Sequence, residues 1–457
     1  MQKILLFIAS LFYFNSLFAK DEIKSWQGIH ETPLSRLEQQ FADPPVEFAN
    51  HVIWGWEGKM DKKTICNDLD SIKKKGFRAI IFEAGYKRPF KYLSEEWFKA
   101  IRTGVLEAKK RGMKVWIIDE GKYPSGFAGG KFSQERPDLR MQALVIGDTI
   151  QIKRGEVMTN HKIAPEIISA VAVSTSGAPN RTVAINNGEI SFNAGLDDWK
   201  ILLVKSDFRT AVTRAVNNPN GGKDATNSLC DYLNPVAVQQ FIDWTHEQYK
   251  KYLGKELGTT VLGFRGDEPD YAHLPWTPSI VQTFKDTKGY DPTPYLASFF
   301  TTSPTIQEQR VKADYWDVWS SLFATHFFKL QADWCAANGV AHITHLNKEH
   351  EMPACVKAEG DYFRNLSKVQ IPGVDAIWNQ IWPGTLNDFP KLASSVAHVY
   401  GKPRAFSESF AAYHISPTIP QAKFVVDHQI ARGINFFEFM FWPAAVSYTH
   451  LRAHETV

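Results

Sequence analysis

Short runs of apolar residues alternate with longer amphipathic segments along most of the chain, beginning near residue 50. The run at residues 51–56 is followed, at residues 62–75, by a segment in which apolar residues recur every three or four positions. Apolar runs bounded by polar loops are typical of strands that are buried on both faces, and the longer period is typical of helices. The pattern therefore predicts strands and helices in alternation, as in a parallel sheet covered by helices.

The same alternation predicts eight such strands, at residues 51–56, 79–82, 114–119, 260–265, 340–345, 374–378, 404–407 and 434–439. Helices are expected between them, including long helical stretches at residues 235–253 and 278–338, the latter interrupted near residues 292–304. Eight strand–helix repeats predict an α/β fold, a (β/α)₈ TIM barrel. A doubly wound open sheet is the alternative, but no Gly-x-Gly-x-x-Gly motif follows the first strand.

The alternation stops between residues 141 and 230, where runs with period two and β-branched residues are separated by turns such as Asn187-Gly188. We interpret this segment as a small antiparallel β domain inserted after the third strand. Residues 45–140 then form barrel strands one to three, and residues 231–445 form strands four to eight.

The two ends of the chain do not follow this pattern. Residues 1–19 combine Lys3, a short apolar stretch and the small residue Ala19, which predicts a secretory signal peptide, with an uncleaved anchor as the alternative. Residues 446–457 resemble a translated adaptor sequence, so we interpret them as a non-native tail that replaces the natural continuation; a short terminal helix is the alternative. No later apolar run reaches ~18 residues, so we expect a periplasmic or extracellular protein without a membrane partner.

Charge and cysteine content narrow the function further. The formal net charge is +3 without a long basic run, which argues against nucleic acid as a partner. The four cysteines form no Cys-x-x-Cys pair, which argues against a zinc ribbon, and we expect four free buried thiols.

Acidic and aromatic residues gather where the predicted strands end. Carboxylates follow six of the eight strands, and tryptophans lie among them. In a (β/α)₈ barrel the active site lies at the carboxyl ends of the strands, and glycoside hydrolysis needs two carboxyl groups, with aromatic faces to hold the sugar. We therefore predict a glycosidase whose sugar-binding residues are Trp54, Trp56, Glu83, Asp119, Glu120, Asp267, His345, Asn347, Asn379, Trp382 and Trp442.

Two carboxylates are the candidates for the chemistry. Glu268 follows the fourth strand and is the candidate general acid, and Glu408 follows the seventh strand and is the candidate base or nucleophile. The alternative for Glu268 is a loop acid paired with Arg265, and the alternative for Glu408 is a structural ion pair. If Glu408 is not the partner, Glu120 or Glu83 is the next candidate.

Neither a metal nor a phosphate motif is present. His342 and His345 lie three positions apart, so on a regular strand only one of them faces the barrel interior, and we prefer His345 for sugar binding. No zinc-type spacing occurs, so we expect no cofactor for the chemistry, and the metal ligands are unknown. A structural calcium stays open because its oxygen ligands leave no short motif outside EF-hands. The loop at residues 119–130 is expected to shape one wall of the pocket.

Several of these segments also resemble a known family. The segments HVIWGWEGKMDKKTICNDLDSIKKKGFRAIIFE, DEGKYPSGFAGG, CDYLNPVAVQQFIDWTHEQYKKYLG, GFRGDEPDY and AFSESF resemble the family 106 α-L-rhamnosidases and a related group of uncharacterised barrel hydrolases. The likeness covers residues 45–443. It implies a barrel glycosidase that binds calcium, inverts the anomeric configuration and carries further β-sandwich domains.

The leading hypothesis is thus a secreted glycoside hydrolase that removes terminal or side-chain sugars from an oligo- or polysaccharide with two glutamates. A retaining, β-galactosidase-like specificity is the alternative to α-L-rhamnoside. A non-catalytic carbohydrate-binding protein on a barrel scaffold is the alternative from another class. An α/β-hydrolase esterase is disfavoured because no Gly-x-Ser-x-Gly motif is present.

Overall fold

The structure is a computed structural model that describes residues 33–85, 89–121, 123–210, 213–214, 223–224, 228–271, 274–385, 387–413 and 417–443. The predicted signal peptide and the predicted non-native tail lie outside these ranges. Among the helices within them, none combines the length and the apolar character needed to cross a bilayer.

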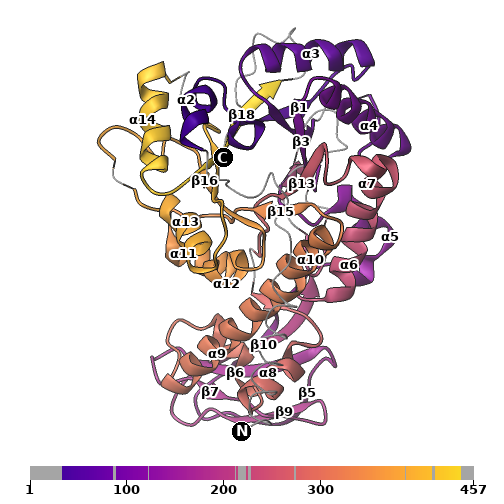
Figure 1. The fold of residues 1–457 in the computed structure, drawn as a ribbon. Coiled ribbons are helices and arrows are strands. Elements are labelled where there is room, and N and C mark those ends of the chain that lie inside the picture. Colours follow the sequence, from indigo (N-terminus) through magenta and orange to yellow (C-terminus); the bar gives the residue numbers. More distant parts are fainter. Residues whose placement is uncertain are drawn as a thin grey trace, which may run out of the picture.

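A closed, eight-stranded parallel barrel forms the upper part of the molecule in Figure 1. Around the barrel the strands follow the order β1-β18-β17-β16-β15-β13-β3-β2, and pairing of β1 with β18 closes it. The predicted (β/α)₈ barrel is therefore confirmed. The strands are β1 (His51–Trp56), β2 (Ala79–Ala84), β3 (Lys114–Ile118), β13 (Val261–Gly266), β15 (Ala341–Thr344), β16 (Ile371–Ala376), β17 (Phe406–Ser409) and β18 (Phe436–Pro443).

Helices surround the barrel, and several begin at a capping side chain that the sequence supplies. Asp61, Ser94 and Asn234 each accept a hydrogen bond from a backbone N–H in the first turn of the following helix. The α-helices are α2 (Leu34–Ala42), α3 (Lys62–Lys74), α4 (Glu95–Lys110), α5 (Lys131–Glu135), α6 (Pro235–Trp244), α7 (His246–Leu253), α8 (Ile280–Lys288), α9 (Ile306–Leu322), α10 (Lys329–Ala337), α11 (Met352–Glu359), α12 (Tyr362–Leu366), α13 (Pro390–Val399) and α14 (Ile419–Ile430). Shorter helical segments are η1 (Val46–Phe48), η2 (Ala128–Gly130), η3 (Pro137–Leu139), η4 (Gly254–Glu256), η5 (Thr293–Phe300) and η6 (Phe323–Phe328).

The segment between β3 and α6 forms antiparallel sheets below the barrel in Figure 1, as the sequence predicts. The main sheet has the strand order β14-β4-β10-β6-β7, and its edge strand β14 comes from beyond β13 in the chain. Helical segment η5 packs against β6. The consecutive helices α9, η6 and α10 run from this sheet up to the barrel. The strands are β4 (Gln142–Ile152), β5 (Val157–Lys162), β6 (Ile167–Ser174), β7 (Arg181–Thr182), β8 (Ile185–Asn186), β9 (Glu189–Asn193), β10 (Trp199–Phe208), β11 (Thr213–Arg214), β12 (Lys223–Asp224) and β14 (Pro275–Trp276).

Several predicted elements differ from the structure, among them the eighth strand, which lies at β18 (Phe436–Pro443) and not at residues 434–439. The sixth strand lies earlier, at β16, because its Pro-Gly pair continues the strand, whereas Trp378 follows it with a φ of 54°. The seventh strand lies later, at β17, and includes Glu408. The long helix predicted at residues 235–253 is broken at Thr245, whose φ and ψ of −113° and −84° are not helical.

Alternation along the strands divides the barrel core into two layers. Residues such as Ile53, Trp116 and Phe406 fill the barrel interior, while Trp54 and Trp56 pack between the wall and the helices. Three cysteines are buried and free as predicted, but Cys66 on α3 is partly exposed, so that prediction is wrong for one thiol.

Candidate active site

Three carboxylates lie side by side on neighbouring strands inside the barrel. Asp375 on β16 is in register with Glu408 on β17, which is in register with Glu438 on β18. All three side chains are buried. Because residues paired in register on neighbouring strands point to the same face, the strand order brings these acids together in one row.

Arg265 on β13 supplies the positive charge that this row requires. Its side chain is fully buried, and its guanidinium makes ion pairs with three carboxylates from different elements. Nη1 lies 2.7 Å from Asp267 Oδ1, Nε lies 3.2 Å from Glu438 Oε2, and Nη2 contacts Glu408 Oε2. A buried charge is stable only when it is paired, so this arginine and these acids depend on one another.

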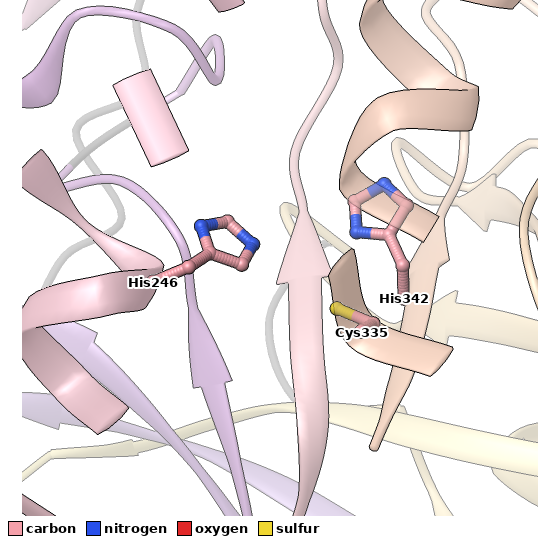
Figure 2. Close-up of side chains that lie close together, drawn as sticks. All are labelled: His246, Cys335 and His342. Carbon is pink, nitrogen blue, oxygen red and sulfur yellow. The ribbon is translucent and has the colours of Figure 1, made fainter. Parts of the chain in front are cut away.

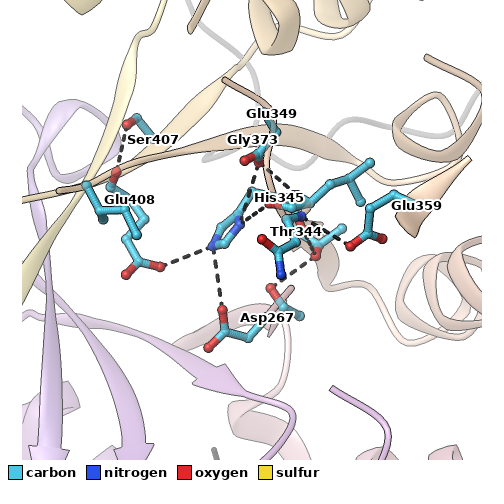
Figure 3. Close-up of polar contacts among 12 residues, drawn as sticks. Asp267, Thr344, His345, Glu349, Glu359, Gly373, Ser407 and Glu408 are labelled. Carbon is cyan, nitrogen blue, oxygen red and sulfur yellow. Dashed lines mark hydrogen bonds and ion pairs between the residues drawn. The ribbon is translucent and has the colours of Figure 1, made fainter. Parts of the chain in front are cut away.

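His345, directly after β15, is the second cation of the site. Figure 3 shows its imidazole between the carboxylates of Glu408, Asp267 and Glu349. Nε2 lies 3.1 Å from Glu408 Oε2 and 3.6 Å from Asp267 Oδ1, and Nδ1 lies 3.1 Å from the carbonyl oxygen of Leu346. Each ring nitrogen thus has an acceptor nearby, which favours the doubly protonated imidazole.

The charges around His345 agree with this protonation. Burial and the nearby Arg265 lower the pKa of His345, but the hydrogen bond to Glu408 and the neighbouring carboxylates raise it further, to well above the usual value. Arg265 Nη2 also lies 2.8 Å from His345 Nε2, and both groups contact Glu408 Oε2. A protonated imidazole adds positive charge beside that oxygen.

Glu268, two residues beyond β13, meets a different environment. Its ligand oxygen lies within 4.8 Å of both His345 and Asp375, and its backbone has a φ of 37°, unusual for a residue with a side chain. Burial, and then the charge of Asp267, raise the pKa of Glu268 to about 8. Its surroundings therefore favour the protonated form of Glu268.

Glu408 has the opposite charge state. Burial by itself raises the pKa of Glu408, but Arg265 and His345 together outweigh burial and lower it to about 2. Both cations contact Oε2, which leaves Oε1 as the oxygen that they do not engage. One ionised and one protonated carboxyl group beside the same histidine is the division that acid–base chemistry at a glycosidic bond requires.

The loop after β15 holds His345 through two further buried acids. Glu349 accepts a hydrogen bond from the backbone N–H of Leu346 at 2.9 Å, and Glu359 accepts one from that of Asn347 at 3.3 Å. Burial raises the pKa of Glu349 to about 7. These acids fix the loop that carries His345, and Asn347 remains half-buried beside them.

Two of the predicted sugar-binding acids organise the glycine-rich loop. The Glu120 carboxylate accepts hydrogen bonds from the backbone N–H groups of Gly121, Ala128 and Gly129 at 2.7, 2.6 and 3.0 Å. Asp119 accepts a hydrogen bond from Ser125 Oγ at 2.6 Å and is fully buried. Both carboxylates thus hold this loop in place, and sugar binding by these two acids stays a prediction.

The predicted sugar-binding tryptophans lie in different environments. Trp54 and Trp56 are fully buried between the barrel wall and the helices, so the prediction that they hold a sugar is wrong. Alternation on β1 points their side chains away from the interior, where Ile53 faces. Trp382 is half-buried against Tyr413. Trp442 lies within β18, but its side chain lies outside the described part of the chain.

The remaining predicted binding residues are Glu83, Asp267 and Asn379. Glu83 lies on β2 and is half-buried, and Asn379 is half-buried beyond β16 with a φ of 55°. Asp267 is also half-buried and belongs to the cluster around Arg265. For Glu83 and Asn379, sugar binding stays a prediction.

Sequence reasoning missed the central arginine and one acid. Arg265 was considered only as a structural partner of Glu268, whereas it contacts Glu408. Asp375 lies near the start of the predicted sixth strand, whereas the candidates were the residues at or just after the strand ends. In each case a charged residue inside an apolar strand was the available signal, since such a charge must meet a partner in the interior.

Two groups of ligand atoms in this cluster lie within 4.8 Å of one another: Asp267, His345 and Glu408, and Glu268, His345 and Asp375. Calcium takes about 6–8 oxygen ligands, whereas each group offers two carboxylates and an imidazole nitrogen. Arg265 already pairs with both carboxylates of the first group. Neither group by itself therefore fits calcium.

Comparisons with known proteins point to one group of enzymes. The glycoside hydrolase family 106 model, described as alpha-L-rhamnosidase, matches residues 180–442. A protein of Formosa agariphila named "Putative beta-glucuronidase" is 24% identical over 465 residues, which cover 89% of this chain and 38% of that protein. The solved structure of a rhamnosidase from Novosphingobium sp. PP1Y has a TM-score of 0.67 and 16% identity, covering 91% of this chain and 57% of that one. The chain thus spans less than two thirds of the length of either relative.

We predict that Arg265→Met lowers the free energy of unfolding by about 3–5 kcal/mol, because it leaves buried carboxylates without their counter-charge. Arg136→Met is the matched control, since Arg136 forms an exposed ion pair with Asp138 and its loss costs about 1 kcal/mol or less. Urea denaturation of both variants measures the difference. Equal, small losses in the two variants would contradict the role given to Arg265.

Proposed function

Because the chain belongs to glycoside hydrolase family 106, the α-L-rhamnosidase family, we propose that it hydrolyses α-L-rhamnosides with Glu268 as the general acid and Glu408 as its ionised partner. The observation that carries this proposal is the opposite charge state of the two carboxyl groups, with pKa values of about 8 and about 2. A non-catalytic binding protein has no need for that separation.

The chemistry follows from the protons that the two groups hold. Glu268 gives its proton to the glycosidic oxygen, which leaves with the electron pair of its bond to the anomeric carbon. The negative charge of Glu408 faces the positive charge that develops on the sugar. Glu408 Oε1 then either takes the proton of the attacking water, which inverts the anomeric configuration, or bonds to the anomeric carbon, which retains it. A ¹H NMR spectrum of the first anomer released distinguishes these two courses.

The positive charges of the site are what hold Glu408 in its ionised form. Arg265 and His345 both contact Glu408 Oε2. A carboxylate with so low a pKa is a weak base, so its main contribution is a charge that stays in place through the reaction. The positive charge that develops on the sugar in the transition state stabilises this ionised form further.

The charge balance of the site favours a neutral sugar over a uronic acid. A glucuronide adds a carboxylate that needs a cation, and both Arg265 and His345 are already engaged by acids of the protein. Rhamnose, a neutral 6-deoxy sugar, brings no such charge. The order of activity we expect on aryl glycosides is therefore α-L-rhamnoside above β-D-glucuronide.

We further propose that the protein is exported and acts on oligo- or polysaccharide outside the cytoplasm, on the strength of the signal-like residues 1–19. Fractionation of cells that produce the full chain, with and without these residues, tests export. A structural calcium remains a proposal as well, and a change in the melting temperature on chelation tests it.

We predict that Glu268→Gln lowers kcat for an aryl α-L-rhamnoside with a poor leaving group by about 10²–10⁴-fold, the usual contribution of a general acid. The loss shrinks for a dinitrophenyl leaving group, which departs without a proton. Glu351→Gln is the control, because Glu351 is an exposed acid on the neighbouring loop. Equal activity of wild type and Glu268→Gln on both substrates would contradict the assignment of Glu268 as the general acid.

We also predict a pH profile set by these two carboxyl groups. Since Glu268 must be protonated and its pKa is about 8, kcat/KM is expected to fall as the pH rises above about 8. The limb set by ionisation of Glu408 lies near pH 2, below the range in which the enzyme is assayed. In Glu268→Gln the basic limb should disappear for the dinitrophenyl substrate. A basic limb that persists unchanged would assign it to another group.

A further inference from the structure

A second cluster of chemically active side chains lies outside the barrel interior. Figure 2 shows His246 at the start of α7, Cys335 on α10 and His342 on β15 gathered around one space. All three are buried, and their ligand atoms lie within 4.8 Å of one another. As predicted, only one of the two histidines near the end of β15 faces the interior: His342 and Ile343 are consecutive, and Ile343 belongs to the interior layer.

The hydrogen bonds of His246 fix which of its nitrogens is free. Thr245 Oγ1 donates to the carbonyl oxygen of Phe241 at 2.7 Å, so its only proton is used there. The 2.9 Å contact between Thr245 Oγ1 and His246 Nδ1 therefore has the imidazole as donor. His246 Nε2 is then an unprotonated acceptor, and no described residue donates a hydrogen bond to it.

Within the part of the chain that the structure describes, His342 also has unpaired ring nitrogens, and unlike His246 it has no hydrogen bond to a neighbouring side chain. Neither of its ring nitrogens has a hydrogen-bond partner among the described residues, although its side chain is almost completely buried. With no acceptor or donor at either nitrogen in this part of the chain, the ring can offer one lone pair to a ligand in its neutral form. Two buried imidazole lone pairs and a thiol in one space are a departure from the rule that buried polar atoms are paired.

The surroundings of the cluster are apolar. The ring of His246 lies 4.2 Å from that of Phe264 and 5.2 Å from that of Trp334, measured between centroids. A ligand that completes these side chains must therefore be small and must accept electron pairs without adding much net charge.

We propose that His246, Cys335 and His342 form a binding site for a single thiophilic transition-metal ion. Imidazole nitrogen and cysteine sulfur are the ligands that such ions select. On binding, the thiol of Cys335 loses its proton to solvent, and its sulfur and the two imidazole nitrogens each donate an electron pair to the metal. The hydrogen bond from His246 to Thr245 is the outer contact that usually orients a ligating imidazole.

Charge and ligand number favour Cu⁺ over Zn²⁺. One thiolate and two neutral imidazoles around Cu⁺ form a neutral complex that suits an apolar interior. The same three ligands around Zn²⁺ leave one positive charge, and a fourth ligand is required for the tetrahedral arrangement that Zn²⁺ prefers. Bond lengths of ~2.3 Å to sulfur and ~2.0 Å to nitrogen mean that metal binding draws these ligand atoms, which lie within 4.8 Å of one another, closer together.

A metal at this site joins β15 to α7 and α10 immediately behind the strand that carries His345 into the barrel mouth. The site is thus expected to stabilise the wall of the barrel without taking part in the chemistry. This inference does not rest on the proposed glycosidase function, and its test needs no substrate.

The experiment is an anaerobic titration of the full chain, freed of metal, with Cu⁺ in competition with a chromophoric chelator, and a parallel titration with Zn²⁺. We expect one equivalent of Cu⁺ per chain, bound more tightly than Zn²⁺, and a rise in the melting temperature on loading. Cys335→Ser is expected to lose this equivalent, and Thr245→Val to bind it ~10–100-fold more weakly.

Cys355→Ser is the matched control, because Cys355 is another buried free thiol, on α11, outside this group of ligands. It should bind the metal as the wild type does. If Cys335→Ser fails to fold by circular dichroism, His246→Gln provides the same comparison. No equivalent bound by the wild type, or equal binding by Cys335→Ser and Cys355→Ser, would overturn the proposal. Tight binding of Zn²⁺ alone would support the site and overturn the preference for Cu⁺.

Discussion

The guanidinium of Arg265 is enclosed inside the barrel, where it faces carboxylates from three different elements. Two unit charges ~4 Å apart attract by about 4 kcal/mol at an effective dielectric constant of ~20, and one pKa unit corresponds to about 1.4 kcal/mol. An attraction of this size, added to that of His345, outweighs the cost of burying a charged Glu408. No hydrogen bond or ion pair in the described residues joins Arg265 to Glu268, so burial decides the protonation of that acid.

The barrel geometry makes this division possible. Parallel strands in register place Asp375, Glu408 and Glu438 in one row, and β13 carries Arg265 into the same layer. With more carboxyl groups than cations in a confined space, Glu408, which contacts both Arg265 and His345, stays ionised most readily. Burial accordingly raises the pKa of Glu438 to about 7 and that of Asp375 well above its usual value. The three acids of this row therefore differ in pKa although they lie side by side.

The barrel was predictable because apolar runs and amphipathic helices are local signals, and strand β1 and helix α3 lie within a residue of their expected positions. Glu268 and Glu408 were also accessible, since the carboxyl ends of barrel strands carry the site. The direction in which Trp54 and Trp56 point could not be predicted, because both layers of a barrel are apolar and residues on either side of the wall look alike. The role of Arg265 could not be predicted either, because its partners are distant in sequence and only strand register shows that they meet. The contacts of Glu120 were not predicted, because its three backbone donors lie in a loop whose path the sequence does not define.

The central claim is that Arg265 and His345 keep Glu408 ionised while burial keeps Glu268 protonated. The most direct test is a ¹³C NMR pH titration of the glutamate side-chain carboxyl carbons, assigned by difference from Glu268→Gln and Glu408→Gln. The account predicts that the Glu268 signal titrates near pH 8 and that the Glu408 signal does not move until the pH approaches 2. Titration of both signals near the ordinary glutamate value of about 4.3 would contradict it.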